Sequence, residues 1–154
     1  MGSLEKKAYI FGSIFTLSNR LQVLGDKFDK NLTIKQWLLL AGIYKCDTDS
    51  PAISEIAALI GSSRQNIKKM GLILEKEGFV TLTKDSADAR ILRMSLTPKC
   101  HDYLLQREKE EIEFLSQLFY GFDSNEIESM AAGIEKLGKA VQKMEKLYSH
   151  EKEE

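Results

Sequence analysis

The sequence contains few of the residues that mark several classes of protein. Its 154 residues include 2 cysteines, 2 histidines and 2 prolines. Two cysteines are too few for a disulfide framework, and two distant histidines give no metal-binding pair. No apolar run approaches the roughly 20 residues of a membrane-spanning helix, and the amino terminus lacks the pattern of a secretory signal. We therefore expect a cytoplasmic protein with no membrane contact, in which Cys46 and Cys100 are reduced.

The charge is low overall but unevenly distributed. The formal net charge of −1 by itself suggests no polyanionic partner. However, residues 62–100 carry a net charge of +4, whereas residues 101–154 carry −6. A basic middle predicts a local contact with an anionic partner, and the acidic tail is expected to face solvent or a second subunit. Ordinary solvated surfaces are the alternative interpretation.

The spacing of apolar residues predicts helices in the first half of the chain. Residues 4–28 carry one apolar stripe, and residues 33–44 are apolar nearly all round, as in a buried central helix. Ser50 is then expected to cap a short helix with Pro51 at its first position. After the break at Gly61, a second short helix is expected to run to about residue 76. Two short helices joined in this way form a helix-turn-helix.

The period of the hydrophobic pattern changes in the second half. Apolar and polar residues alternate in Val80–Thr83 and again in Leu92–Leu96, which predicts two strands. The polar residues between them predict a hairpin with an extended tip. Helices are expected again over Lys99–Phe119 and Glu126–Tyr148. The last of these carries apolar residues at alternating steps of three and four, which is the spacing of a coiled-coil seam.

The second short helix has an outward face suited to DNA. At about 100° per residue, Ile67, Met70, Gly71 and Leu74 point inward. Arginine and lysine pair with guanine edges or phosphates, glutamine pairs with adenine, and the amino-terminal amides of a helix attract phosphate oxygens. An ordinary solvated helix face is the alternative. The outward residues are Arg64, Gln65, Lys68 and Lys69, with Asn66 at the border of the face and Ser63 before it.

The tip of the hairpin offers a second contact with DNA. It includes Lys84, Asp85, Asp88 and Arg90. An arginine on an extended loop suits a narrow minor groove, where the negative potential is strongest. Asp88, two residues earlier, can orient the guanidinium by a bidentate pair. The alternative is a local surface salt bridge, which contributes little to stability.

The predicted hairpin resembles the wing of a known family. From Asp85 to Thr97 the chain reads DSADARILRMSLT, which is similar to the signature D-P-x-D-R-R followed by L-T of the MarR family of bacterial and archaeal transcriptional regulators. Residues 32–39, 54–57 and 74–80 are similar to the family in the same order and spacing. The likeness therefore extends over nearly the whole chain.

The resemblance implies a mainly α winged helix-turn-helix fold with a two-stranded β wing. It implies a homodimer that binds pseudo-palindromic operators in double-stranded DNA and represses, or less often activates, nearby genes. Within a single domain, 1–154, residues 32–98 would form the DNA-binding lobe, and residues 1–30 and 99–154 would form dimerisation helices. Many members of the family also release DNA when a small aromatic compound binds in a cleft between these parts. The sequence assigns no residues to such a site.

Two sets of candidate residues follow from the pattern and the resemblance together. The DNA-binding set is Ser63, Arg64, Gln65, Asn66, Lys68, Lys69, Lys84, Asp88 and Arg90. The dimerisation set consists of apolar residues on the end helices, although such stripes are more often plain core. Its members are Phe11, Phe15, Ile127, Ile134, Val141 and Met144.

The chain departs from the family signature at three positions. Ser86 stands where proline is usual, Ala89 replaces the first of the paired arginines, and Cys100 lies where glycine is common. We therefore expect a wing tip that is more flexible and lacks one cation. Cys46 lies beside Asp47 and Asp49, which disfavour a thiolate, so we expect structural cysteines and not redox sensors.

No motif predicts an enzyme. Residues 133–140 spell most of a phosphate-binding P-loop, but they end in Ala140 where a Ser or Thr must hold magnesium, and no strand precedes them. We expect no catalytic site, cofactor or metal. The alternative to a DNA-binding regulator is a winged-helix module that contacts an acidic protein. A module of that kind would be expected to replace Arg64, Lys68, Lys69 and Arg90, and this chain retains all of them.

Overall fold

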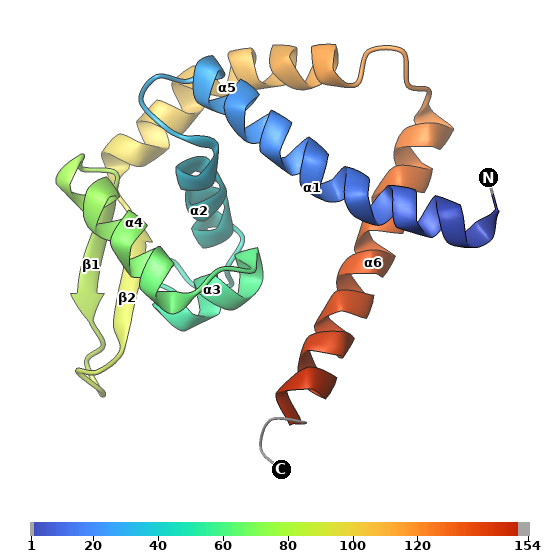
Figure 1. Ribbon diagram of the computed structural model, residues 1–154. Helices are drawn as coiled ribbons and strands as arrows, with labels where there is room; N and C mark the ends of the chain where they lie inside the picture. The colour runs from blue at the N-terminus through green and yellow to red at the C-terminus, as the bar shows by residue number, and fades with distance from the viewer. Residues whose placement is uncertain (1, 151–154) are drawn as a thin grey trace. The chain divides into compact units, whose positions relative to one another are not determined.

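The computed structural model describes residues 2–150, and it divides into two compact units between Gln106 and Arg107. The first unit contains the predicted helix-turn-helix and hairpin (Figure 1). The residues that the structure describes are mainly helical and include one two-stranded antiparallel sheet, which confirms the predicted fold class. The elements of the first unit are α1 (Ser3–Phe28), α2 (Ile34–Tyr44), α3 (Ile53–Ile60), α4 (Arg64–Lys76), β1 (Val80–Lys84), β2 (Leu92–Leu96) and the start of α5 (Pro98–Leu118).

The core of the first unit lies under α2, α3 and α4. Leu39 and Leu40 have no exposed surface, as expected from the apolar character of residues 33–44, and neither do Ile56 on α3 and Ile67 on α4. Helix α4 packs closely on the hairpin because Gly71 has no side chain. A Cβ at that position would overlap Cε of Met94 on β2, which is itself fully buried. The position of α4 relative to the hairpin is therefore fixed by close packing.

Two helices begin where the sequence predicts, and each is capped by a hydroxyl. The Thr33 side chain accepts a hydrogen bond from the backbone N–H of Gln36, and Ser63 accepts one from Asn66. These bonds satisfy amides that a helix leaves unpaired in its first turn. Gly61 between α3 and α4 has φ of +70°, a conformation that glycine adopts without strain. The turn of the helix-turn-helix therefore depends on this glycine.

The predicted start of α3 is wrong. Ser50 does not cap the helix and Pro51 is not its first residue, because α3 begins at Ile53 with Ala52 as its N-cap. The carbonyl of Pro51 instead accepts a hydrogen bond of 3.0 Å from the N–H of Met94. Ala52 forms an isolated antiparallel bridge with Arg93. Residues 51 and 52 therefore lie along the edge of β2, and this pairing delays the start of the helix.

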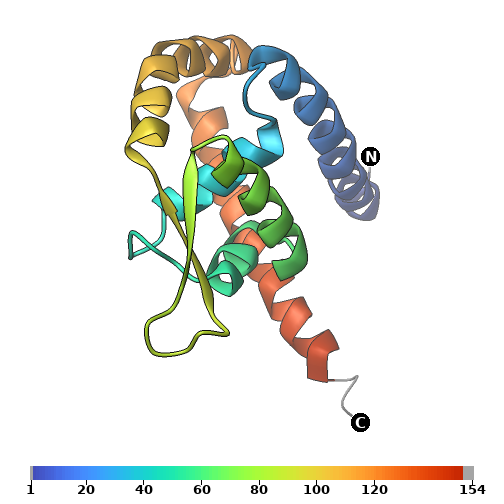
Figure 2. The ribbon, with the colours of Figure 1, turned by 90° about the vertical axis from the view of Figure 1, so that its left-hand side faces the viewer.

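The hairpin is confirmed, with Val80 opposite Leu96 and Lys84 opposite Leu92. Figure 2 shows the hairpin beside α4, with the loop that connects β1 to β2 at the end of the hairpin. Pro98 is the first residue of α5, one residue before the start that the sequence predicts. Thr97 joins the two elements, because its hydroxyl donates to the carbonyl of Gly78 and accepts from the N–H of Cys100.

The second unit contains the rest of α5 and helix α6 (Ser124–His150). A turn at Gly121, with φ of +89°, separates the two helices, and the Asp123 carboxylate caps α6 by accepting from the N–H of Glu126. The predicted apolar seam of α6 is exposed in the single chain, and Ile134 is 68% exposed. Among the described residues, no helix is both long and apolar enough to cross a membrane.

Candidate nucleic-acid interface

Helix α4 presents the basic face that the sequence predicts. Ile67, Gly71 and Leu74 are buried and hold the helix against the core. The opposite residues are all exposed, so their side chains are available to a ligand in solution. We call this surface the basic face, and its members are Arg64, Gln65, Lys68 and Lys69.

The border residue Asn66 has a structural contact that the sequence did not indicate. Its side-chain Nδ2 donates a hydrogen bond of 3.0 Å to Oγ of Ser62, and its backbone N–H donates to Oγ of Ser63 at 3.1 Å. Asn66 thus joins the turn of the helix-turn-helix to the first turn of α4. This contact orients the side chain, and the expected contact with a phosphate stays a prediction.

The far end of α4 is tied to the sheet. Oε1 of Glu75 accepts a hydrogen bond of 2.8 Å from the backbone N–H of Leu82 on β1. That N–H belongs to the edge of β1 that does not pair with β2, so it needs a partner from elsewhere. Glu75 supplies the partner and links α4 to the hairpin.

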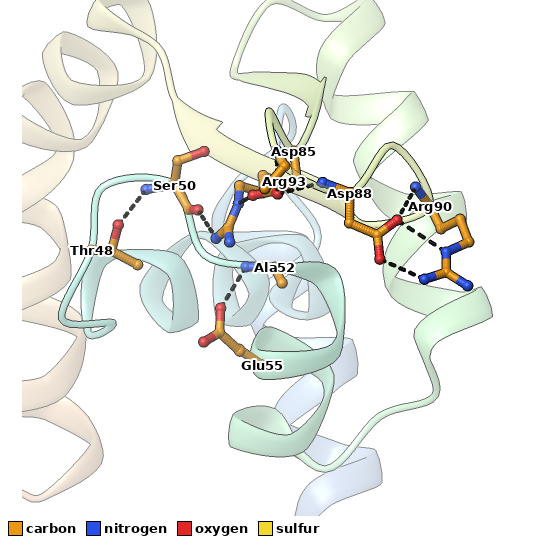
Figure 3. Close-up of polar contacts among 9 residues, drawn as sticks. Thr48, Ser50, Ala52, Glu55, Asp85, Asp88, Arg90 and Arg93 are labelled. Atoms are coloured by element: carbon orange, nitrogen blue, oxygen red, sulfur yellow. Dashed lines mark hydrogen bonds and ion pairs between the residues drawn. The ribbon is translucent and has the colours of Figure 1, made fainter.

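At the tip of the hairpin, Asp88 holds Arg90 by a bidentate ion pair, as predicted. Nε of Arg90 lies 3.0 Å from Oδ1 of Asp88, and Nη2 lies 2.9 Å from Oδ2. Oδ1 also accepts from the backbone N–H of Arg90. The Arg90 side chain is 90% exposed, whereas that of Asp88 is 33% exposed. Figure 3 shows this pair at the outer end of the loop. Asp88 thus orients a guanidinium that extends into solvent.

The same contacts fix the charge state of the pair. The hydrogen bonds from the Arg90 side chain and then from its backbone lower the pKa of Asp88 below its ordinary value. The hydrogen bond to Asp88 raises the pKa of Arg90. Both groups are therefore charged at neutral pH, so a cation stands at the tip of the wing.

A second ion pair in the hairpin was missed by the sequence analysis. Nε of Arg93 on β2 lies 2.5 Å from Oδ1 of Asp85, and Nη1 lies 3.0 Å from the carbonyl oxygen of Ser50. Hydrogen bonds from the Arg93 side chain and then from the N–H groups of Asp88 and Ala87 lower the pKa of Asp85. The alternation of apolar and polar residues in β2 indicated that Arg93 lies on the polar side of the strand. It did not indicate that Asp85 and the Ser50 carbonyl are the partners of Arg93.

The first unit also contains a cleft. It has a volume of about 710 Å³ and lies between α1, α2 and the turn that joins α3 to α4. Ile14, Leu21 and Trp37 contribute apolar surface, whereas Ser62 and Asn66 contribute polar groups. Two of its lining residues therefore form the hydrogen bond at the start of α4. The sequence analysis assigned no residue to a cleft.

Neither cysteine has the surroundings of a reactive thiol. Burial, then the carboxylates of Glu55 and Asp47, raise the pKa of Cys46. The sequence indicated Asp47 and Asp49, and the structure adds Glu55 from α3. Cys100 is fully buried, which raises its pKa to about 11. Both are free, and the described residues include no group of three or more His, Cys, Asp or Glu side chains that could hold a metal ion.

The arrangement described above, with a capped helix beside a two-stranded wing, defines a winged helix-turn-helix protein. Solved structures with this fold match the chain. A MarR/EmrR family transcriptional regulator from Acinetobacter sp. ADP1 has a TM-score of 0.76 and 16% identity, over 89% of this chain and 97% of that one. The transcriptional regulator BldR from Sulfolobus solfataricus has a TM-score of 0.75 and 18% identity, over 91% and 99%. The DNA complex of MepR from S. aureus has a TM-score of 0.73 and 19% identity, over 88% and 97%.

The chain is also similar in sequence to a curated protein. It is 29% identical over 92 residues to the transcriptional repressor MprA of Escherichia coli strain K12, and the match covers 60% of this chain. The match spans about half, or 52%, of the length of that repressor. No protein-family model matches the chain. These likenesses confirm the MarR-type fold that the wing signature implies.

Proposed function

We propose that the protein is a sequence-specific, double-stranded DNA-binding transcriptional regulator that acts in the cytoplasm as a homodimeric repressor. One observation carries the proposal: a single folded unit displays the basic face of α4 together with Arg90 at the wing tip, bidentately held and 90% exposed. The basic face suits the major groove, and the wing arginine suits the adjacent minor groove. The similarity to named regulators and to a repressor supports this assignment.

The charges available to DNA predict a steep dependence on salt. Five exposed cations per protomer belong to the proposed interface: Arg64, Lys68, Lys69, Lys84 and Arg90. Each phosphate neutralised contributes about −0.9 to the slope of log K against log salt. For a dimer in which some of these cations contact bases instead of phosphates, we expect a slope between about −5 and −9.

The exposed apolar rows on the end helices support the dimer. Phe11 and Phe15 on α1 are 67% and 58% exposed and form an edge-to-face pair with each other. On α6, Ile134 and Met144 are 68% and 52% exposed. Apolar rows of this length are unusual on the surface of a monomer and mark contacts between proteins. A second copy would bury them symmetrically.

The cleft supports release by a small ligand. Its volume of about 710 Å³ is within the range of small-molecule sites, and its apolar walls suit an aromatic compound. Asn66 and Ser62 line it, so a ligand there would contact the residues that hold the start of α4. A ligand that binds more tightly to a conformation in which α4 is displaced would weaken DNA binding. The size of the effect is set by the ratio of the ligand's affinities for the displaced and the DNA-binding conformations.

Selection of the purified protein on a random duplex library, followed by a salt series on the enriched site, tests the proposal. We expect an enriched inverted repeat with half-sites about one helical turn apart. The salt slope should lie in the range given above. Binding without sequence preference, or no binding, would refute the specific regulator.

The alternative is a winged-helix module that contacts another protein. One observation favours it: Leu72, which follows Lys68 and Lys69 by one turn on α4, is 52% exposed. A leucine on the outer side of this helix suits an apolar partner better than a phosphate. If the library yields no enriched sequence, a pull-down with the wild-type chain and with a Leu72→Glu variant would be the test of this alternative.

A further inference from the structure

The loop of the wing is connected to the body of the lobe by the Arg93 side chain. Its guanidinium lies between two elements: Nε donates to Oδ1 of Asp85 at 2.5 Å, and Nη1 donates to the carbonyl oxygen of Ser50 at 3.0 Å (Figure 3). Ser50 lies 43 residues before Arg93, in the loop between α2 and α3. The Arg93 and Asp85 side chains are 33% and 14% exposed, so this contact is more protected than the pair at the tip. We call these three groups the Arg93 brace.

Asp85 extends the brace into the loop of the wing. Its Oδ2 accepts hydrogen bonds of 3.0 Å from the backbone N–H groups of both Ala87 and Asp88. Its own N–H donates to the carbonyl of Ile91 at 2.9 Å, which closes the base of the loop. The backbone of Asp88 is thus held by Asp85, and the side chain of Asp88 holds Arg90. A continuous series of contacts runs from Ser50 to the exposed guanidinium.

The other end of the brace rests on a well-fixed part of the fold. Ser50 precedes Pro51, whose carbonyl accepts the Met94 N–H, and Ala52, which pairs with Arg93. The Ala52 N–H also donates to Oε2 of Glu55 at 2.6 Å, at the start of α3. Because this segment is paired on one side with β2 and on the other with α3, it can act as a reference position for the wing.

We propose that Arg93 and Asp85 are positioning residues that set where the wing presents Arg90 to DNA. The inference rests on the proposed function and adds to it residues outside the predicted interface. The brace also restricts the loop of the wing at the place where the sequence, with Ser86 instead of the usual proline, predicts a flexible tip. Arg93 contacts Asp85 and Ser50 in the free protein, so its role is to hold the loop and not to bind phosphate.

Two variants that break the same ion pair with opposite charge changes test the proposal. Arg93→Gln removes a positive charge, and Asp85→Asn removes a negative one. If only charge mattered, Arg93→Gln would weaken binding to the enriched operator and Asp85→Asn would strengthen it. If the brace positions the wing, both should weaken it, by about 5- to 30-fold, which corresponds to the loss of one oriented contact.

Matched controls separate the brace from nearby charge. Lys45→Gln and Asp47→Asn make the same charge changes at exposed positions in the loop between α2 and α3, at least three residues before Ser50. We expect each control to change operator affinity by less than about 2-fold, since neither side chain belongs to the brace or to the proposed DNA interface. The Asp85→Asn/Arg93→Gln double variant should bind operator no more weakly than the weaker single variant, because the two substitutions remove the same contact.

A double-mutant cycle with Arg90 gives a result that a purely structural role would not produce. In the wild-type background, Arg90→Ala should weaken operator binding by about 5- to 150-fold. In the Arg93→Gln background the same substitution should cost less than about 3-fold, because Arg90 is already misplaced. Arg90 bonds to Asp88, whereas Arg93 bonds to Asp85 and Ser50, so coupling between the two arginines would come through the loop.

The outcomes distinguish the brace from the proposed function. If the wild type selects no operator, both proposals fail. If the wild type selects an operator and Arg90→Ala weakens binding equally in both backgrounds, the brace is refuted and the regulator stands. Thermal unfolding and circular dichroism of every variant show which have folded. Should Arg93→Gln not fold, Asp85→Asn in the same cycle with Arg90→Ala decides, and an unchanged cost of Arg90→Ala overturns the proposal.

Discussion

The dimer proposed from the end helices makes a quantitative prediction at Ile134. Complete burial of an isoleucine side chain is worth about 1.5 to 3 kcal/mol. Ile134 is 68% exposed in the single chain, so about two-thirds of that free energy, or about 1 to 2 kcal/mol, is available on association. A two-fold interface uses the residue twice, which doubles the effect to about 2 to 4 kcal/mol for each dimer. Ile134→Ala should therefore raise the dimer dissociation constant about 30- to 1000-fold.

Sedimentation equilibrium over a range of protein concentrations measures this constant directly. Ile134→Glu should be more severe, because it places two carboxylates in the apolar seam, and should yield monomers or aggregates. Ala132→Glu is the matched control, since it adds the same charge on the opposite side of α6, about 160° around the helix. The control should dimerise like the wild type. An unchanged dissociation constant for Ile134→Ala, or equal effects of the two glutamates, would refute the assignment of the seam.

Three further predictions concern the wing and the thiols. Arg90→Ala should weaken operator binding by about 5- to 150-fold with unchanged thermal stability, as measured by fluorescence anisotropy, and equal affinity would remove the wing from the mechanism. Because the pKa of Asp88 is lowered below 3.8, the pair with Arg90 is intact above that value and is lost only as the pH falls through the lowered pKa. The ratio of wild-type to Arg90→Ala affinity should thus stay constant from about pH 8 to pH 5, and a midpoint within that range would contradict the assignment. With its pKa raised to about 11, buried Cys100 should not react with a thiol reagent at about pH 8 until the protein unfolds, whereas rapid labelling of the native protein would show that the site opens.

Local periodicity was enough to predict most of the secondary structure. The stripe of Ile67, Gly71 and Leu74 fixed which side of α4 faces the core, and the prediction that Arg64 and Lys68 are exposed followed from the same rotation. The bidentate pair of Asp88 and Arg90 was also predictable, because the two residues are close in the chain. In each of these cases the interaction depends on neighbours within a few positions.

Features that depend on distant parts of the chain were missed. The prediction that Ser50 caps α3 used the local preference for serine before proline. It failed because Pro51 and Ala52 pair with β2, about 40 residues later in the chain. The brace between Arg93 and the Ser50 carbonyl was missed for the same reason, since a backbone acceptor leaves no signal in the sequence. Local reasoning therefore identified the cation at the tip of the wing but not the contacts that hold the loop.

The two ion pairs of the wing also determine which charges contribute to the salt dependence. Residues 84–93 include Lys84, Arg90 and Arg93, but Asp85 neutralises Arg93 through an ion pair of 2.5 Å. Asp88 remains beside Arg90 and offsets part of its charge, so this pair contributes less to the salt slope than the other four cations of the proposed interface. Most of the released counterions should then come from the basic face of α4. Lys68→Gln should consequently lower the salt slope by about 0.9 per protomer, whereas Arg93→Gln should lower affinity with little change in slope.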